Sequence, residues 1–379
     1  MGDRDATVRV AAIQAASVFL DREASTAKAC ELIGRAGDGG ARLIAFPEGF
    51  IPAHPVWFHF HPATGKVAND LSVALFQNAV EIPGPEITLL QQAAAEARAY
   101  VVVGVCERRR DTFGTLYNTL AFLGPDGALL NRHQKLVPTV GERLVHAPGE
   151  PRGLMAVPTS FGPASALICG ENSNPLAIAT LIAQYTRVHV MSWPNHFPTS
   201  GLPLRQRVMI DSQAFAQMSK AFVVSACGTM DDQAIERLQV NDDQAALLKS
   251  PDFCGGSVIV APNSRVIAGP LGPEEDILYA DLDLELGVRM KLRHDFAGHY
   301  NRPDVFQLSV HIGAMPLLDL VAPPAPPVSL AVPGDDGRPA PGIQAGRKPS
   351  PALPSPALPS PATPEERDGV DDPDGILGS

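Results

Sequence analysis

Three short segments each combine a residue that can do chemistry with an apolar run that can hold it. Cys169 ends the run in LICGENSNPLA, Glu48 follows the run in LIAFPEG, and Lys135 precedes the apolar residues of HQKLVP. A thiol attacks as the thiolate, so it needs a base to take its proton and positive charge to stabilise the product. A carboxylate and an ammonium supply both, and these residue types predict nucleophilic catalysis if the fold brings them together.

Cys169 differs from the other cysteines because its strand pattern stops at it. The others are Cys30, in a helical pattern, Cys254, at a Gly-Gly turn, and Cys106 and Cys227, inside apolar runs typical of buried strands. An odd number of cysteines without C-x-x-C spacing argues against a disulfide framework and against a zinc site. The end of a strand, facing a loop, is where an α/β scaffold places chemistry. Cys169 is therefore the candidate nucleophile.

Glu48 and Lys135 are ambiguous when each is taken alone. Strand-end glutamates and lysines are usually surface residues. An ammonium among the apolar neighbours of Lys135 is costly unless a carboxylate pairs with it. A half-buried carboxylate at position 48 would have a raised pKa and would suit a base.

The elements that must position these residues alternate between strands and helices. Strand patterns cover residues 8–16, 41–48, 100–107, 116–127, 165–170, 188–193, 221–228 and 255–262, and helical patterns cover 21–37, 84–98, 175–186 and 203–219. Asn174 is a candidate N-cap before Pro175, and Pro125-Asp126-Gly127 predicts a hairpin turn. A similar order of elements occurs before and after Lys135. We expect two sheets covered by helices on the outside.

Composition limits the class of protein. The 379 residues are 45% hydrophobic with a formal net charge of −11, which suits a globular protein with a sizeable core. No apolar run is long enough for a membrane span, and an acidic balance without basic clusters argues against nucleic acid as a partner. Unpaired cysteines without a secretion signal predict a cytoplasmic setting.

The composition changes near Val321. Of the 37 prolines, 15 lie in the last 58 residues, which contain a Pro-Ser-Pro-Ala-Leu repeat and an acidic run. Such a segment buries too little apolar surface to offset its ordering entropy. We expect a folded domain over residues 5–320 and a disordered tail over 321–379.

Five blocks in order resemble those of the nitrilase superfamily of carbon-nitrogen hydrolases. They are FPEGFIP, HQKLVPTVGER, LICGENSNPLA, GGSVIVAPNSRVIAGPL and GHYNRPDVF, and together they span about residues 7 to 310. The resemblance implies a four-layer α-β-β-α sandwich. It also implies that Glu48 is the general base, that Lys135 stabilises the tetrahedral intermediate and that Cys169 is the nucleophile. Glu142 would support the lysine, and no metal or organic cofactor would be needed.

Within that superfamily the blocks are most similar to the nitrilase branch. CGENSNPLA and GHYNRPDVF carry this likeness, whereas Gln134, Gly170 and His146 depart from the residues frequent there. A nitrilase hydrolyses an organic nitrile to a carboxylic acid and ammonia through a cysteine thioimidate and thioester. The alternatives are an amidase or another hydrolase of the superfamily, and a catalytically inactive oligomeric scaffold. The resemblance also implies a homo-oligomer.

Further residues are candidates for binding the substrate. The N–H of Gly170, with the ammonium of Lys135, would form an oxyanion hole. Trp193 and His196 follow another strand that should end at the same edge, although Trp193 could equally pack in a core. His54 lies with His59 and His61 in a histidine-rich stretch. Without matching cysteine or carboxylate spacing, these histidines favour a pocket rim or a subunit contact over a metal site.

Overall fold

The computed structural model describes residues 7–195 and 202–313, which form two β-sheets. The first sheet has the strand order β11-β1-β2-β3-β4-β5. Its strands are β1 (Thr7–Gln14), β2 (Leu43–Ala45), β3 (Tyr100–Arg108), β4 (Leu116–Leu123), β5 (Leu129–Gln134) and β11 (Asp276–Asp283). The central strands β1, β2 and β3 are parallel, so their carboxyl ends meet at one edge, just before Glu48 in the case of β2.

The second sheet has the strand order β10-β9-β8-β7-β6. Its strands are β6 (Ala164–Ile168), β7 (Val188–Trp193), β8 (Phe222–Cys227), β9 (Val258–Val260) and β10 (Val266–Ala268). The strands β6, β7 and β8 are parallel and almost wholly buried, which explains their near-continuous apolar sequences. The first of them ends directly before Cys169.

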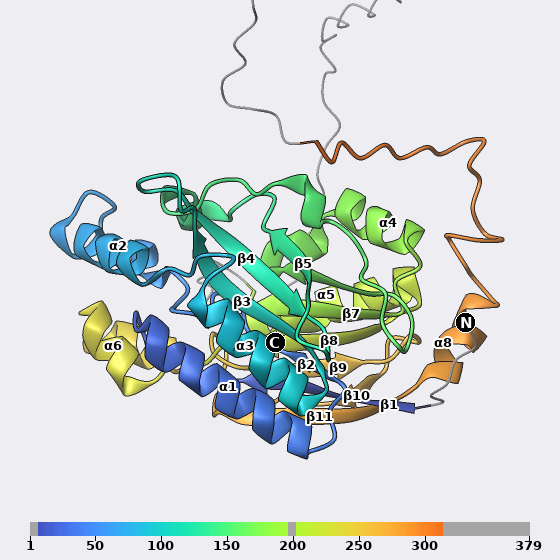
Figure 1. The fold of residues 1–379 in the computed structure, drawn as a ribbon, viewed down its shortest axis with the longest axis horizontal. Coiled ribbons are helices and arrows are strands. Elements are labelled where there is room, and N and C mark those ends of the chain that lie inside the picture. The colour runs from blue at the N-terminus through green and yellow to red at the C-terminus, as the bar shows by residue number, and fades with distance from the viewer. Residues whose placement is uncertain (1–6, 196–201, 314–379) are drawn as a thin grey trace, which may run out of the picture. The chain divides into compact units, whose positions relative to one another are not determined.

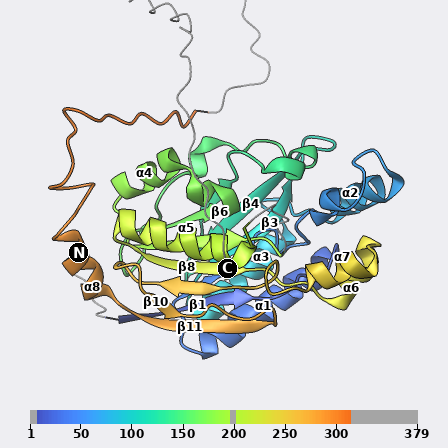
Figure 2. The ribbon, with the colours of Figure 1, turned by 180° about the vertical axis from the view of Figure 1, so that it is seen from behind.

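Helices cover the outer face of each sheet, so the unit has four layers (Figures 1 and 2). The main helices are α1 (Arg22–Asp38) and α3 (Pro85–Ala97) on the first sheet, and α4 (Pro175–Ala183) and α5 (Leu204–Ser219) on the second. Strand β1 shows how the layers are sorted. Val8, Val10 and Ala12 face the core between the sheets, whereas Ala11 and Ile13 face α1 and α3.

Shorter elements complete the described unit. They are the helices α2 (Lys66–Asn78), α6 (Asp232–Leu238), α7 (Asp242–Leu248) and α8 (Leu284–Lys291), and the 3-10 turns η1 (Val56–His59), η2 (Val140–Leu144), η3 (Pro151–Gly153) and η4 (Cys169–Ser173). After α8 the chain passes through turns at residues 292–293, 296–300 and 303–305, and then continues to residue 313 as an extended segment that leaves the body of the unit (Figure 1). Among the described residues no helix has the length and apolar character needed to span a bilayer.

The predicted α-β-β-α sandwich is confirmed, and the predicted strands and helices correspond to β1 to β9, α1, α3, α4 and α5. Three predicted strands are too long: β2 covers three residues of 41–48, β9 covers three of 255–262, and β4 covers eight of 116–127. The patterns missed β10, β11, α2, α6, α7 and α8. Strand β11 escaped because it is a half-exposed edge strand with a polar sequence, DILYADLD. The predicted disordered tail lies outside the described residues.

Candidate active site

Lys135 lies between two buried carboxylates at the edge where the sheets end. Its Nζ is 2.8 Å from Oε1 of Glu48 and 2.6 Å from Oε2 of Glu142, and all three residues are at least 96% buried. The structure thus brings Glu48 next to Lys135 and Glu142, which follow it by more than 80 residues in the sequence. Burial opposes the charge of Lys135, but Glu48 and Glu142 outweigh that effect and raise its pKa, so the ammonium is retained.

Asn118 links the two carboxylates and was missed from the sequence. Its Nδ2 donates to Oε1 of Glu48 at 2.6 Å and to Oε1 of Glu142 at 2.7 Å. Its own backbone carbonyl accepts from the N–H of Lys135 at 2.8 Å, so it also fixes the backbone of the lysine. The signal was available, because Asn118 is an amide inside the buried apolar strand LYNTLAFL. A buried amide in such a strand needs polar partners.

Glu142 is surrounded by donors. The backbone N–H of Thr139 donates to its Oε2 at 2.9 Å, and Nδ1 of His146 lies 3.0 Å from its Oε1. These contacts add to those from Lys135 and Asn118. Burial works against its charge, yet Lys135 and His146 prevail and hold the pKa of Glu142 well below its usual range. Glu142 is therefore the permanently ionised member of the cluster.

Glu48 has a different environment. Within the part of the chain that the structure describes, only its Oε1 is hydrogen-bonded and its buried Oε2 has no partner. Burial raises the pKa of Glu48 to about 7, with Lys135 opposing the rise and the charge of Glu142 adding to it. A carboxylate that titrates near neutrality and keeps one oxygen free can accept and return a proton.

The loop that carries Glu48 is fixed by close backbone packing. The backbone N–H of Glu48 donates to the carbonyl of Trp193 at the end of β7, 3.1 Å away, which ties the two sheets together. Gly104 on β3 passes so close that a Cβ there would lie 2.2 Å from the Pro47 carbonyl oxygen and 3.0 Å from the Cα of Glu48. Only glycine fits at position 104, because backbone atoms cannot move aside as side chains do.

Cys169 lies at the sharp turn between β6 and η4. Its φ is +47°, a left-handed conformation that is energetically unfavourable for any residue with a side chain. Residues in such conformations cluster at functional sites. The thiol is 98% buried. Burial raises the pKa of Cys169 well above its usual range, Glu48 and Glu142 add to that rise, and Lys135 and the N–H of Gly170 oppose it. The resting group is a neutral thiol that needs a base during attack.

A buried hydrogen-bond network of Glu171 and Asn172 fixes the turn at Cys169. Glu171 accepts from the N–H of Leu136 at 2.7 Å and from the N–H of Ile168 at 3.1 Å. Asn172 donates to the carbonyl of Cys169 at 2.9 Å and is itself bonded to His189 at 2.9 Å. The network joins the cysteine turn to the segment after Lys135, so Cys169 and Lys135 share one support.

The four residues predicted to bind substrate differ in their burial and in their contacts with the cluster. His54 is 93% buried with Nδ1 3.6 Å from Oε1 of Glu48, and burial lowers its pKa to about 3. Gly170 has room for a side chain, since an added Cβ would meet only Oγ1 of Thr139 at 3.5 Å. Trp193 is fully buried, and its Nε1 has no hydrogen-bond partner. His196 lies outside the described residues.

Asn195 was also missed. It lies two residues after Trp193, is 93% buried, and its side-chain oxygen has no hydrogen-bond partner among the described residues. Since Trp193 contacts the backbone of Glu48, these groups lie on the Glu48 side of the site. An unpartnered buried oxygen and an unpartnered indole N–H are polar groups that a bound molecule can satisfy.

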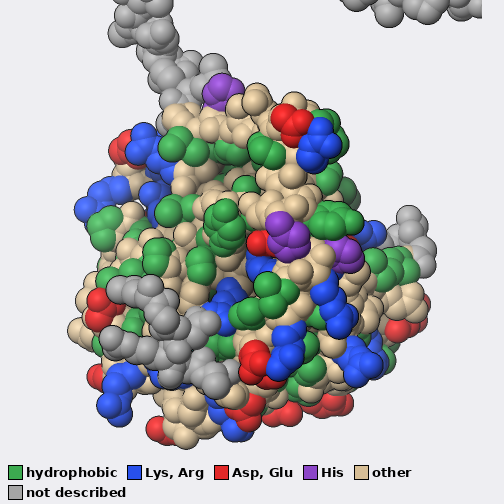
Figure 3. Space-filling model, turned by 90° about the vertical axis from the view of Figure 1, so that its right-hand side faces the viewer, with side chains coloured by type: hydrophobic (Ala, Val, Ile, Leu, Met, Phe, Trp, Pro, Cys, Tyr) green, Lys and Arg blue, Asp and Glu red, His purple; other side chains and the backbone are tan. Residues whose placement is uncertain are grey.

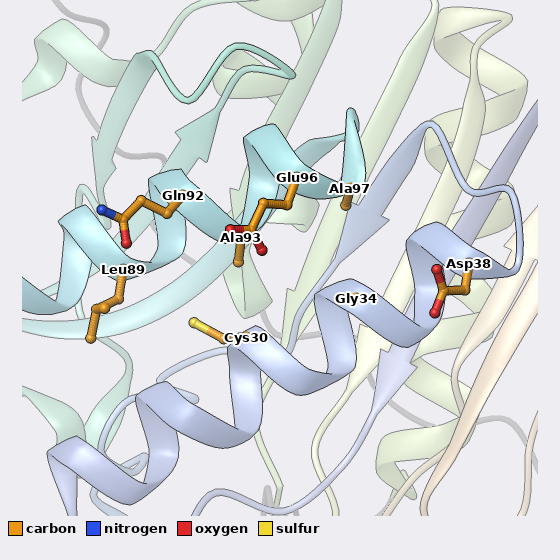
Figure 4. Close-up of a pocket in the computed structure, with 8 residues that line it drawn as sticks. All are labelled: Cys30, Gly34, Asp38, Leu89, Gln92, Ala93, Glu96 and Ala97. Carbon is orange, nitrogen blue, oxygen red and sulfur yellow. The ribbon is translucent and has the colours of Figure 1, made fainter.

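Two other features of the described residues are not part of this site. No group of three or more His, Cys, Asp or Glu side chains within residues 7–195 and 202–313 has the geometry of a metal site. A surface pocket of about 380 Å³ lies between α1 and α3, and Figure 4 shows Cys30 of α1 pointing toward α3 there. The pocket contains none of the buried cluster residues, and it is a gap between outer helices.

Known proteins share both the sequence and the fold. Residues 9–291 match the carbon-nitrogen hydrolase family. Nitrilase 2 from an unknown prokaryotic organism is 37% identical over 304 residues, covering 80% of this chain and 92% of the relative. An arylacetonitrilase from Aspergillus niger is 35% identical over 314 residues, covering 81% of this chain and 92% of the relative.

Solved structures share the sandwich at lower identity. Nit3 from Saccharomyces cerevisiae, a member of branch 10 of the nitrilase superfamily, superposes with a TM-score of 0.57 at 18% identity, covering 79% of this chain and 99% of the other. The C. elegans NitFhit protein superposes with a TM-score of 0.61 at 17% identity, covering 82% and 69%. The chain is a hydrolase that acts on carbon-nitrogen bonds, and it belongs to the carbon-nitrogen hydrolase family of the nitrilase superfamily.

Proposed function

We propose that this protein is a nitrilase, which hydrolyses an organic nitrile to a carboxylic acid and ammonia with Cys169 as the nucleophile. The observation that carries the proposal is the buried cluster itself. A lysine ammonium is held by two carboxylates, one of them with a free oxygen and a pKa near neutrality, and a strained thiol lies within reach of their charges. The relatives at 35–37% identity with nitrilase and arylacetonitrilase names favour a nitrile over other substrates.

In the first half of the proposed reaction, the sulfur of Cys169 adds to the nitrile carbon. Glu48 takes the thiol proton through its free Oε2 and passes it to the nitrile nitrogen, which gives a neutral thioimidate. The charge that develops on nitrogen during addition faces the ammonium of Lys135 and the N–H of Gly170. Because these donors are already in place and buried, they need no reorganisation during the reaction.

In the second half, Glu48 removes a proton from water as that water adds to the thioimidate carbon. The resulting tetrahedral intermediate loses ammonia after its nitrogen is protonated, which leaves a thioester on Cys169. A second water, activated in the same way, releases the carboxylic acid and restores the thiol. Glu142 remains ionised throughout and keeps the ammonium in place.

The test is ammonia release from matched nitrile and amide pairs, including phenylacetonitrile and phenylacetamide, by wild type and Cys169→Ala. Release from the nitrile that is lost in Cys169→Ala, with a thioimidate or thioester adduct on Cys169 by mass spectrometry, supports a nitrilase. Release from amides alone would identify an amidase instead. Release from neither across a broad panel, or full activity in Cys169→Ala, would refute the proposal.

We also propose that the protein acts as a homo-oligomer. Residues 298–313 are exposed throughout, and Phe306, Leu308, Val310 and Ile312 alternate along the extended segment with exposed fractions of 75%, 44%, 39% and 62%. Alternating apolar residues on an unpaired extended segment suit a strand that pairs with another chain. Figure 3 shows further hydrophobic side chains gathered over the middle of one face of the unit.

Light scattering after size-exclusion chromatography tests the oligomer. Wild type should elute as a dimer or larger, and Phe306→Asp with Ile312→Asp should shift it toward the monomer. Gln307→Asp, between the apolar positions, is the matched control and should leave the size unchanged. A monomeric wild type would contradict this part of the proposal.

The five free cysteines favour a reducing, cytoplasmic setting, which is our proposal for localisation. Fractionation of the source cells tests it: the protein should be found with cytoplasmic markers, and recovery with secreted proteins would contradict it.

A further inference from the structure

A second buried thiol contacts the catalytic cluster through a histidine. Sγ of Cys106 on β3 lies 3.2 Å from Nε2 of His146, and Nδ1 of the same ring lies 3.0 Å from Oε1 of Glu142. The thiol, the ring and the carboxylate are each at least 96% buried. The proposed reaction assigns no role to Cys106 or His146, so the contact needs its own explanation.

The protons in this chain can be assigned from its chemistry. An ionised carboxylate only accepts hydrogen bonds, so Nδ1 of His146 must carry a proton and donate to Glu142. Burial raises the pKa of Cys106 well above its usual range, with Glu142 and Glu107 adding to the rise, so the thiol keeps its proton. The thiol then donates to Nε2, and the two contacts hold the ring in one orientation with Nδ1 as the donor to Glu142.

The two carboxylates of the cluster receive unequal numbers of donors. Glu142 accepts from Lys135, Asn118, Thr139 and His146, so both of its oxygens are used. Glu48 accepts from Lys135 and Asn118 on one oxygen only. Because Lys135 and Asn118 serve both carboxylates, the contacts that distinguish them are those from Thr139 and His146.

We propose that Cys106 and His146 act as a positioning pair that keeps Glu142 ionised and thereby leaves Glu48 as the carboxylate that exchanges protons. This inference rests on the proposed role of Glu48 as the base. Two carboxylates that share one ammonium titrate as a pair. Without the His146 donor, the proton would divide between them, and part of the protein would hold it on the wrong carboxylate.

The charged groups around His146 allow a clear sign for the pH effect. His146 faces Glu142, which lies on η2, and Cys106, which lies on β3. The charges of Lys135 and Glu48 act in the same cluster beside the buried, neutral ring of His54, and Glu107 lies next to Cys106. Removing the Nδ1 donor makes Glu142 easier to protonate, so the cluster gains a proton at higher pH. We call the fall of activity on the acidic side of the pH profile the acid limb. The acid limb should therefore move to higher pH.

The experiment measures kcat and KM against pH for wild type, His146→Phe, His146→Gln, Cys106→Ala and Cys106→Ser. Phenylalanine keeps the ring volume without a donor, whereas glutamine keeps an N–H. Loss of one charge-assisted hydrogen bond corresponds to about a ten- to hundredfold effect. His146→Phe should lose about that in kcat, with KM little changed and the acid limb displaced upward. His146→Gln and Cys106→Ser should keep most of the wild-type kcat, and their acid limbs should lie at the wild-type pH.

Cys106→Ala should fall between wild type and His146→Phe, because the ring keeps its donor but loses its anchor. Cys254→Ala is the matched control, since Cys254 is also buried and its thiol bonds instead to the carbonyl of Pro273 at 3.9 Å. It should lower the melting temperature without moving the limb. If the role of His146 were purely structural, His146→Phe would likewise lower the melting temperature without moving the acid limb.

A second readout does not depend on turnover. The rate at which iodoacetamide alkylates Cys169, followed by intact mass against pH, reports the same base. The proposal of a positioning pair would be overturned if the acid limb of His146→Phe coincided with that of wild type, both in turnover and in alkylation. Equal displacement in His146→Phe and His146→Gln would overturn it too. A wild type without hydrolytic activity would instead count against the proposed function, and alkylation would still decide about the pair.

Discussion

Two buried carboxylates, Glu107 on β3 and Glu48 in the loop after β2, lie in contrasting environments. Glu107 on β3 accepts from Oγ1 of Thr119 at 2.8 Å, from Nε2 of Gln134 at 3.2 Å, and from both Nε and Nη2 of Arg132. Glu48 is equally buried, yet one of its oxygens has no partner. A saturated carboxylate stabilises the strands it joins. A carboxylate with an unpartnered oxygen loses stability but can bind a proton, so we expect the incompletely hydrogen-bonded member of the pair to be the functional one.

The sharpest test of this contrast compares Glu48→Gln with Glu107→Gln. Glu48→Gln should lower kcat about 10²- to 10⁴-fold, the usual contribution of a general base, with a cooperative melting transition retained. Turnover of a nitrile substrate and thermal unfolding of both variants provide the measurement. If Glu107→Gln lost as much kcat as Glu48→Gln in its folded state, the contrast would fail.

Lys135→Arg should have the next largest effect. Arginine keeps the charge, but its planar head does not fit between Glu48 and Glu142, so kcat should fall about 10²- to 10³-fold. The double variant with Glu48→Gln should lose far less than the product of the two single losses, because the residues act as one unit. Near wild-type turnover in Lys135→Arg would remove the lysine from the mechanism.

The pH dependence of kcat/KM should report the titration of Glu48, the carboxylate with an unpartnered oxygen. Burial raises the pKa of Glu48 to about 7, so the base is protonated and inactive below that value. Activity should fall about tenfold per pH unit below the midpoint and level off above it. A profile that is flat from pH 5 to 8, with a substrate that does not ionise there, would contradict the assignment.

Glu107→Gln should show its effect in stability alone. Its partner Arg132 is partly exposed, with a side-chain exposure of 36%, so solvent screens part of the lost interaction. We expect a loss of about 1–3 kcal/mol in the free energy of unfolding, measured with urea, and kcat within about twofold of wild type. Unchanged stability would mean that the saturated contacts contribute nothing.

Removal of residues 325–379 should have the smallest effect. The proline-rich composition of this segment predicts that it adds little to the folded domain, which we place at residues 5–320. Activity and melting temperature should match those of the full chain. A large drop in the melting temperature would show that the composition misleads.

The sequence named the candidate residues of the buried cluster more completely than the residues that support them. Glu48, Lys135 and Cys169 stand out because each interrupts or ends an apolar run, and Glu142 came only from the resemblance. Asn118 and His146 were missed as members of the cluster, because their role depends on which strands are neighbours. Strand order is a property of the tertiary fold, and the local pattern does not contain it.

The same limit applies to the sheets. Buried central strands such as β3 and β8 are continuous apolar runs, so their sequences identify them. Strand β11 is a half-exposed edge whose identity comes from its partner β1, more than 260 residues away. Pairing energy from a distant strand can override a weak local preference, and a reading of one window cannot include it.

That pairing also sets an order of events during synthesis. Strand β1 pairs with β11 along its whole length, from Thr7 opposite Asp283 to Gln14 opposite Asp276. All the proposed catalytic residues have been synthesised once position 169 is added, yet one side of β1 stays unpaired for more than a hundred further residues. Such a long-range contact forms late and slowly. A nascent chain therefore carries the complete catalytic sequence beside an open strand edge, and we expect it to need protection from aggregation until β11 closes that edge.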